Sequence, residues 1–185
     1  MDILEYRHQR ENNSKRHPWE LAKLYFIEQV VGNLMNAAHG GIKSVLDLGC
    51  GDGFICRALA MRFPSVKFHG VDTALSTDLI NKLQTECPLD NLSFHRGIEC
   101  NHKYASGFDL VLLLDILEHI DDDLSFLTDL ADSPLINPNG RFLITVPAHD
   151  AIYSSHDRIL KHYRRYKASQ LNSLVSTAGL IVSDQ

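Results

Sequence analysis

The sequence predicts an α/β domain built on a doubly wound, mostly parallel sheet. Short apolar runs alternate along the chain with stretches whose apolar residues recur every three or four positions, which indicates strands alternating with helices. A glycine-rich turn directly follows the first of these runs, as at a strand-to-helix junction. Hydrophobic residues make up 44% of the 185 residues, which is enough for one sizeable core but hardly for two.

Five of the apolar runs are almost continuous, as expected for parallel strands that are buried on both faces. They lie at residues 44–48, 66–71, 92–95, 108–114 and 141–146. Helices are predicted between and after them, at residues 54–63, 75–86, 122–130 and 168–178. This alternation predicts helices on the faces of one open sheet.

A charged leader at residues 1–17 precedes a single predicted domain at residues 18–185. Pro18 suits the first position of a helix, because its missing N–H would be unpaired there in any case. We expect this helix to continue to about residue 38, before Gly40 and Gly41 end it. Trp19, near its start, either closes over a bound ligand as a lid or anchors the helix.

Composition argues against several classes of partner. The formal net charge of −5 disfavours nucleic acid and anionic lipid. The four cysteines have neither the spacing of a zinc site nor the density of a secreted disulfide scaffold, so we expect reduced thiols in a cytoplasmic protein. No apolar run approaches the ~18 residues of a membrane span, and the polar residues 1–13 are unlike a signal peptide.

Residues 45–53, with the sequence VLDLGCGDG, are the most informative segment for function. Three alternate glycines let the backbone turn tightly and present amides to a ligand at a helix N-terminus. A dinucleotide-binding fingerprint would place its third glycine at position 54, where this chain has Phe54, and it rarely carries an acid like Asp47. NAD is therefore the weaker hypothesis, and Asp47 better suits the ammonium group of a bound amino acid.

A second acid, Asp72, ends the second predicted strand 23 residues after Gly49. A carboxylate at that place accepts hydrogen bonds from both hydroxyls of a ribose. Together with the glycine turn it predicts a site for an aminoacyl-nucleoside. The alternative is that Asp72 caps the helix expected to start near Leu75.

These residues resemble the class I, Rossmann-like S-adenosylmethionine-dependent methyltransferases, in particular the small-molecule group, and the likeness covers about residues 43–180. VLDLGCGDG is similar to the family's first motif and GVD, at residues 70–72, to its second. Residues 108–120 and 139–143 resemble the segments of strands four and five. The resemblance implies S-adenosylmethionine as the cofactor and a contact with it at Asp47, Gly49, Cys50, Gly51, Asp72, Thr73 and Leu114.

The sequence departs from the family after the third strand, where Ile98 replaces the acid that many relatives place beside the adenine. Either the backbone of Ile98 or the side chain of Glu99 is expected to make that contact. The family sheet has seven strands, whereas this chain ends just inside the predicted sixth. A free edge on strand five then predicts either a homodimer through that edge or a shortened chain.

Methyl transfer is an in-line displacement, so the acceptor should lie at the carboxyl ends of strands four and five. Asp115 is a candidate catalytic residue there, and His119 a candidate acceptor contact. The alternative for Glu118 and His119 is pairing with loop backbone. Asp121 is expected to cap the helix that follows.

Residues 147–166, which we call the acceptor-side segment, are rich in His, Arg and Tyr. They resemble the HD…HYRRY stretch that forms a wall of the acceptor pocket in one subset of the family. His149 and His156 are candidate general bases, Tyr153 a candidate acceptor contact, and Arg164 and Arg165 candidates for holding a carboxylate or phosphate. The alternative is a solvated or self-paired surface. No metal is expected, because the spacing of the histidines in this segment fits no helical pair.

The leading functional hypothesis is thus a methyltransferase that acts on a small anionic acceptor. A catalytically silent S-adenosylmethionine-binding module is the second hypothesis, and an NAD-dependent oxidoreductase is the third.

Overall fold

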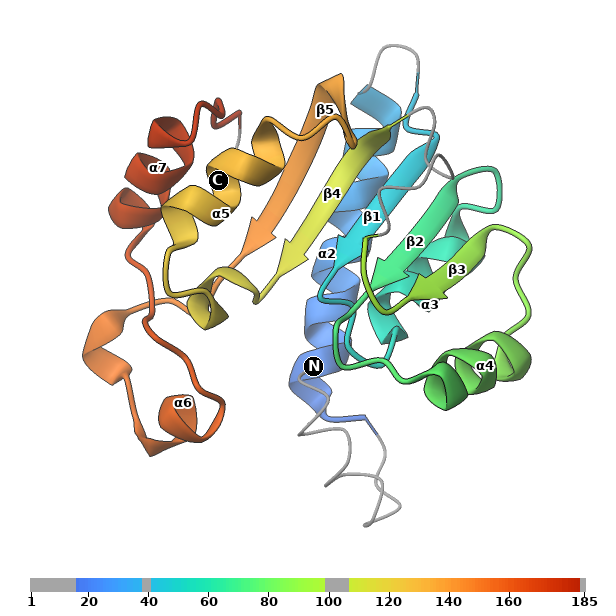
Figure 1. Cartoon of the computed structure of the whole chain (residues 1–185), viewed down its shortest axis with the longest axis horizontal. Coiled ribbons are helices and arrows are strands. Elements are labelled where there is room, and N and C mark those ends of the chain that lie inside the picture. Colours follow the sequence, from blue (N-terminus) through green and yellow to red (C-terminus); the bar gives the residue numbers. More distant parts are fainter. Residues whose placement is uncertain (1–15, 38–40, 99–106, 184–185) are drawn as a thin grey trace.

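The computed structural model describes residues 16–37, 41–98 and 107–183. Five parallel strands form one sheet in the order β3-β2-β1-β4-β5 (Figure 1), which confirms the predicted doubly wound architecture. The strands are β1 (Ser44–Leu48), β2 (Lys67–Val71), β3 (Leu92–His95), β4 (Phe108–Leu114) and β5 (Ile136–Thr145). The α-helices are α2 (Pro18–Ala37), α3 (Phe54–Arg62), α4 (Thr77–Glu86), α5 (Asp123–Ala131), α6 (Ser155–Ile159) and α7 (Ala168–Thr177).

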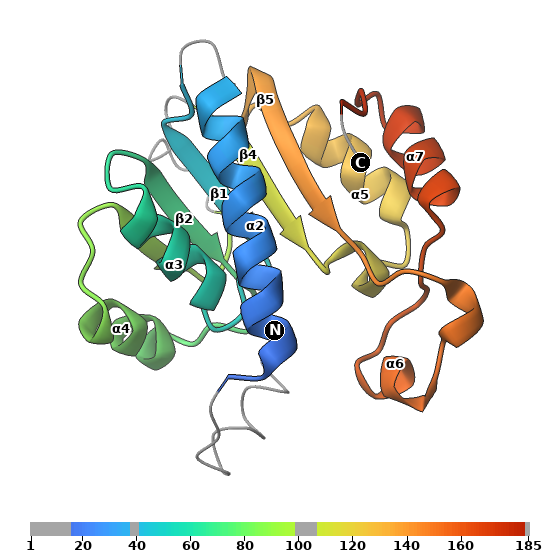
Figure 2. The same cartoon turned by 180° about the vertical axis from the view of Figure 1, so that it is seen from behind.

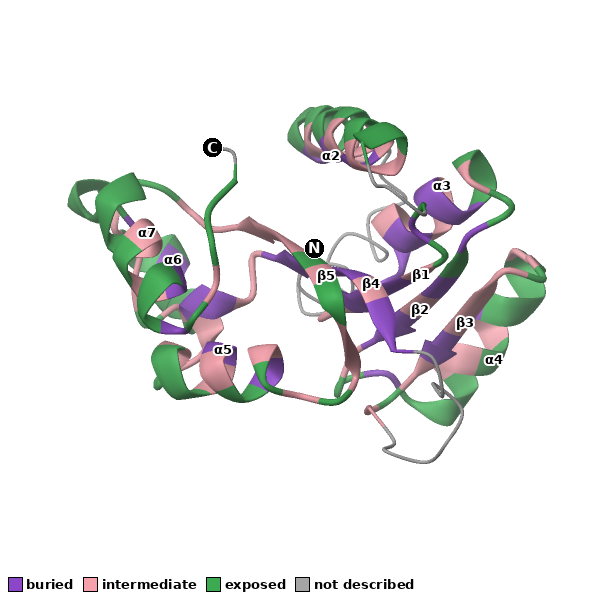
Figure 3. Cartoon of the chain, turned by 90° about the horizontal axis from the view of Figure 1, so that it is seen from above, coloured by how far each residue is buried: buried purple, intermediate pink, exposed green. Residues whose placement is uncertain are grey.

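Helices cover both faces of the sheet. Viewed from behind, α2 and α3 lie across one face, and α5 and α7 lie on the other side (Figures 1 and 2). Successive residues of a strand point to opposite faces, so Val45 joins the core beneath α2 and α3 while Leu46 joins the core beneath α5 and α7. The central strands β1 and β4 are therefore buried on both faces (Figure 3).

Most predicted boundaries agree with the structure to within two residues, but β5 begins at Ile136 rather than at residue 141. Pro138, Asn139 and Gly140 suggest a turn, yet they lie inside this strand. An edge strand tolerates a proline because one side of its backbone needs no partner. The pairing of β5 with β4 is also irregular at this end, between Phe108 and Leu110.

The edge at β5 is where the expected sixth strand should pair. Residues 181–183 form no strand, and Ile181 is 93% exposed, so no sixth strand is present among the described residues. Pairing of this edge with another chain stays a prediction. No helix in the described part of the chain is long and apolar enough to cross a membrane.

The acceptor-side segment is a compact excursion from the sheet rather than an open loop. Its ends meet in a parallel bridge between Ala148 and Tyr166. Between them lie the short 3-10 helix η2 (Asp150–Ile152) and α6, which starts with a capping box made by Ser154 and Asp157. The segment projects beyond the carboxyl end of β5 (Figure 1).

Candidate functional site

The glycine turn between β1 and α3 is held against the end of β2. The amides of Gly49 and Cys50 both donate to the carbonyl of Val71, at 2.7 and 3.1 Å. Gly49 has a φ of 75°, and a Cβ atom there would clash with the side chain of Ile116. Gly53 likewise has a φ of 71° and no room beside the Phe94 ring. The turn therefore requires glycine at both positions.

Asp72 lies beside this turn, at the carboxyl end of β2. Its two carboxylate oxygens accept hydrogen bonds from the amides of Gly51, at 3.0 Å, and Ala74, at 2.8 Å. The capping alternative is wrong, because the Ser76 hydroxyl oxygen accepts from the amide of Leu79 and caps α4. The carboxylate and the glycine turn thus form one edge of a crevice, as a ribose site requires.

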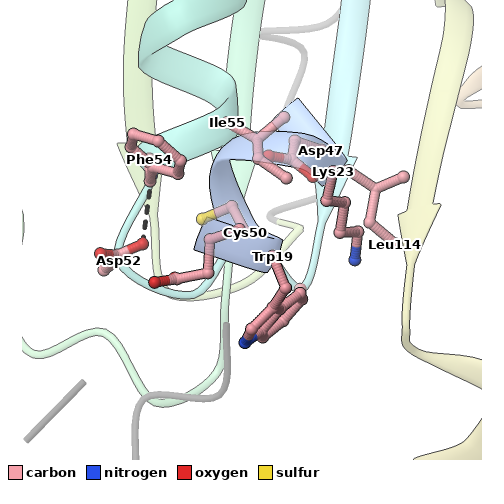
Figure 4. A pocket seen from close by; sticks show the side chains of 10 residues that line it. Trp19, Lys23, Asp47, Cys50, Asp52, Phe54, Ile55 and Leu114 are labelled. Atoms are coloured by element: carbon pink, nitrogen blue, oxygen red, sulfur yellow. Dashed lines mark hydrogen bonds between the residues drawn. The ribbon is translucent and has the colours of Figure 1, made fainter. Parts of the chain in front are cut away.

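A narrow pocket lies between the glycine turn and the start of α2, where Trp19 and Lys23 face Cys50 and Asp47 (Figure 4). Asp47 is 2% exposed, and burial raises its pKa to about 7. A cationic group beside this carboxyl would therefore favour its ionised form. This chemistry fits the ammonium group of a bound amino acid.

The start of α2 is fastened to the crevice by ion pairs. Arg16 pairs with Asp52 and, at 3.1 Å, with Glu20. Glu20 also accepts a hydrogen bond from the amide of His17, which secures the first turn of the helix. The ion pairs and the buried face of α2 anchor the helix, while Trp19 is 46% exposed and lines the rim of the crevice.

A larger cavity of about 560 Å³ continues from the glycine turn toward the acceptor-side segment. Its apolar wall includes Ile116, Phe126 and Leu160. Of the residues predicted from the sequence, it is lined by Gly49, Asp72, Thr73, Leu114, Asp115, His119, His156 and Arg165. One cavity therefore joins the predicted cofactor residues to the predicted acceptor side.

Other predicted site residues do not line this cavity. His149 and Ile98 are absent from its wall, and Ile98 packs against the core beneath α5. Tyr153 lies outside it, where its hydroxyl donates to the carbonyl of His162 at 2.7 Å. Glu99 lies outside the described residues.

Asp115 directly follows β4 and lines the cavity, with a φ of 59° that is unusual for a residue with a side chain. Lys23 forms an ion pair with its carboxylate, and the hydroxyl of Thr145 donates to it at 2.9 Å. Burial alone would raise the pKa of Asp115, but Lys23 and Thr145 outweigh burial and hold this pKa below its usual range. A carboxylate with such a low pKa is a weak base.

Three polar groups that sequence reasoning did not bring together meet at the far side of the cavity. A carboxylate oxygen of Glu118 and one ring nitrogen each of His119 and His162 all lie within 4.8 Å of one another. Glu118 is 1% exposed, and neither of its carboxylate oxygens has a hydrogen-bond partner among the described residues. Burial, and then the charge of Asp115, raise the pKa of Glu118 to about 8. The alternative of pairing with loop backbone gives no hydrogen bond to the Glu118 carboxylate within the described part of the chain.

The two arginines that were expected to hold an anionic acceptor have partners within the protein. Arg164 pairs with Asp123 at 2.7 Å and lies 3.7 Å from Asp121. Arg165 pairs with the buried Asp157 at 2.7 Å. The cap of α5 is Asp122 rather than Asp121, because the Asp122 carboxylate accepts a hydrogen bond from the amide of Ser125 in the first turn of the helix. The arginine charges are thus balanced by nearby carboxylates.

Comparison with known proteins places the chain in a family. A family model described as a methyltransferase domain matches residues 6–184. A ubiquinone biosynthesis O-methyltransferase from Coxiella burnetii is 27% identical over 156 residues, covering 77% of this chain and 65% of that protein. The protein of the same name from Chromobacterium violaceum is 28% identical, covering 75% and 64%. The chain thus spans slightly under two thirds of the length of these curated relatives.

Solved structures show the same fold at low sequence identity. An O-methyltransferase family protein from Burkholderia thailandensis superposes with a TM-score of 0.60 at 18% identity, over 86% of this chain and 52% of that one. The [4+2]-cyclase SpnF gives a TM-score of 0.67 at 18% identity, over 93% and 62%. The match to the family model shows that the chain belongs to the methyltransferase domain family, with S-adenosylmethionine as its cofactor.

Proposed function

We propose that the protein transfers a methyl group from S-adenosylmethionine to a hydroxyl oxygen of a small molecule. The observation that carries this proposal is the single cavity that joins the glycine turn and Asp72 to the polar group of Glu118, His119 and His162. The relatives named O-methyltransferases support oxygen as the acceptor atom. S-Adenosylmethionine supplies a methyl group bonded to a positively charged sulfur.

The residues of the chain divide between the two ends of the cavity. Asp72 and the glycine turn bind the ribose, and Asp47 favours the ammonium group of the methionine part. The apolar wall excludes water and packs against the acceptor skeleton, which aligns the hydroxyl with the methyl group. The sequence suggested that Arg164 and Arg165 bind an anionic acceptor. Because both side chains are paired with carboxylates of the protein, the site favours an acceptor without a permanent negative charge.

Calorimetry with S-adenosylmethionine, S-adenosylhomocysteine and NAD tests the cofactor. We expect both sulfur nucleosides to bind and NAD not to bind. Asp72→Ala should weaken the binding by about 1–3 kcal/mol, the range for a lost hydrogen bond to a charged group. Asp90→Ala, in an exposed turn, is the matched control and should bind as the wild type does.

Transfer of a radioactive methyl group to a panel of phenols and alcohols then tests the reaction. Methylated product supports the proposal. Tight cofactor binding without product from the panel or from a cell extract would instead identify a silent binding module. Unchanged affinity in Asp72→Ala would contradict the assignment of the ribose site.

A further inference from the structure

A buried carboxylate fixes the orientation of His162 within the acceptor-side segment. Asp157 is fully buried, and its Oδ1 atom lies 3.0 Å from His162 Nδ1 and 2.7 Å from Arg165 Nε. Burial alone would raise the pKa of Asp157, but Arg165, the amide of Ser154 and His162 together hold it well below its usual range. An ionised carboxylate only accepts hydrogen bonds, so Nδ1 must carry the proton of a neutral ring. The basic nitrogen of His162 is then Nε2.

The backbone holds this histidine from both sides. Lys161, the preceding residue, has a φ of 59°, which turns the chain sharply after α6. The amide of His162 donates to the carbonyl of Asp157 at 2.8 Å, and its own carbonyl accepts from the Tyr153 hydroxyl. His162 is therefore tied to α6 by backbone and side-chain hydrogen bonds. No described residue hydrogen-bonds to Nε2.

The surroundings of His162 suit a hydroxyl group. The ring lies 4.7 Å from that of His119, edge to face, and near the buried Glu118 carboxyl, which has no hydrogen-bond partner in the described chain. A buried polar group without a partner costs free energy unless a ligand or water satisfies it. Since the raised pKa keeps Glu118 protonated at neutral pH, it offers a donor as well as an acceptor. Of the charged groups around this corner, Asp157 contacts the His162 ring and pairs with Arg165. The charges of Asp115, Lys23 and Arg165 act on Glu118, and Arg158 and Lys161 line the outer side of the His162 ring.

We propose that Glu118, His119 and His162 form the binding site for the acceptor hydroxyl, and that His162 is the general base of the methyl transfer. The inference deepens the proposed function and rests on it. Nε2 takes the hydroxyl proton while the oxygen forms a bond to the methyl carbon. The bond between that carbon and sulfur breaks, and its electron pair stays on the sulfur, which becomes a neutral thioether. Asp157 balances the charge of the resulting imidazolium and is a positioning residue.

This assignment replaces two histidines that the sequence suggested as bases. His149 does not line the cavity, and His156 lies on the exposed first turn of α6. Asp115 lies nearer the glycine turn, but Lys23 and Thr145 already stabilise its charge. Among these candidates, His162 alone combines a place in the cavity wall with the 3.0 Å hydrogen bond between its Nδ1 atom and the buried Asp157 carboxylate.

The variant His162→Asn keeps a donor for Asp157 but cannot take up a proton. We expect the single-turnover methylation rate to fall at least ~100-fold at neutral pH, the lower end of the usual effect of a general base. The remaining rate should rise steadily with pH, because hydroxide then removes the proton. Affinity for S-adenosylhomocysteine and the melting temperature should stay near their wild-type values. Tyr163→Phe, which changes the exposed neighbouring residue, is the matched control and should keep both rate and pH profile.

A second measurement does not depend on turnover. 4-Nitrophenol absorbs visible light only as its anion, so its spectrum reports proton transfer at the site. With S-adenosylhomocysteine present, wild-type protein should increase the anion signal at a pH where free nitrophenol is largely neutral, and His162→Asn should not. Asp157→Asn should reduce the increase without abolishing nitrophenol binding.

The outcomes separate the inference from the proposed function. A wild-type enzyme that methylates, with an unchanged rate and pH profile in His162→Asn, would overturn the base and leave the function standing. Failure of the wild type to bind S-adenosylmethionine would overturn the function, whereas the nitrophenol spectrum would still report on His162. Loss of the wild-type rate in a chelator, restored by a divalent metal, would assign the cluster to a metal ion and overturn the general base.

Discussion

Replacement of Glu118 by glutamine should stabilise the protein in a way that depends on pH. The carboxyl group is buried without a hydrogen-bond partner among the described residues, and its pKa is raised from 4.5 to about 8. Between these values the folded protein keeps a proton that the unfolded chain loses. Stability therefore falls as pH rises through this window. Glutamine has nearly the same size and cannot ionise, so the variant does not show this fall.

The size of the effect follows from the same two pKa values. Each unit of pH within the window costs about 1.4 kcal/mol, so the 2.5 units between 4.5 and pH 7 correspond to at most about 3.5 kcal/mol. Because the cavity admits water that screens the charge, we expect Glu118→Gln to be about 1–3 kcal/mol more stable than the wild type at pH 7. Near pH 5 the two proteins should differ by less than about 1 kcal/mol.

Urea unfolding, followed by circular dichroism at several values between about pH 5 and pH 8, measures this difference. Glu86→Gln is the matched control, because Glu86 is exposed and forms only a surface ion pair with Lys82. Its effect should be small at every pH. A stability difference for Glu118→Gln that stays constant across this range would refute the raised pKa and, with it, the neutral state of Glu118.

Two further changes test the packing around the site. Gly49→Ala places a methyl group against Ile116 in a backbone conformation that favours glycine, so cofactor affinity and melting temperature should both fall. Calorimetry measures the affinity and thermal melts measure the stability. Adding Ile116→Ala to the Gly49→Ala variant should recover part of the loss. A wild-type melting temperature in Gly49→Ala would contradict the close approach of Ile116 to Gly49. Tyr166→Phe removes the hydroxyl that lies 2.7 Å from Asp123 and 3.1 Å from the carbonyl of Leu117, which should cost about 1–2 kcal/mol in urea unfolding. The exposed Tyr163→Phe should cost almost nothing, and equal losses in the two variants would show that the buried hydroxyl adds no stability.

The buried strands could be located from the sequence because their short, nearly continuous apolar runs favour a buried strand over a turn or a surface helix. β5 was only partly predicted, since local turn propensity at Pro138, Asn139 and Gly140 conflicts with pairing that only the neighbouring strand supplies. The glycine turn and Asp72 could be found because their function depends on local backbone geometry. The capping alternative for Asp72 needed the structure, which shows that Ser76 caps the helix.

The acceptor side is formed by residues that are far apart in the sequence, so no local sequence pattern predicts their contacts. Glu118 and His162 are 44 positions apart in sequence and meet only because the acceptor-side segment packs against the turn that follows β4. The arginines of that segment suggested an anionic acceptor, but Arg164 pairs with Asp123, the first residue of α5, which lies 41 positions before it in the chain. The basic composition of the segment is visible in the sequence, whereas the pairing of Arg164 and Arg165 with carboxylates required the fold.

The ion pair between Lys23 and Asp115 has a consequence for how the molecule assembles. The two residues are 92 positions apart, and the acid is oriented by Thr145 of β5. α2 is the first described helix along the chain, yet this part of its docking site exists only after the fourth and fifth strands have paired. Contacts of such long range form slowly, because a large loop must close first. We therefore expect α2 to dock among the last steps of folding and its amides to exchange with solvent before those of β1 and β4.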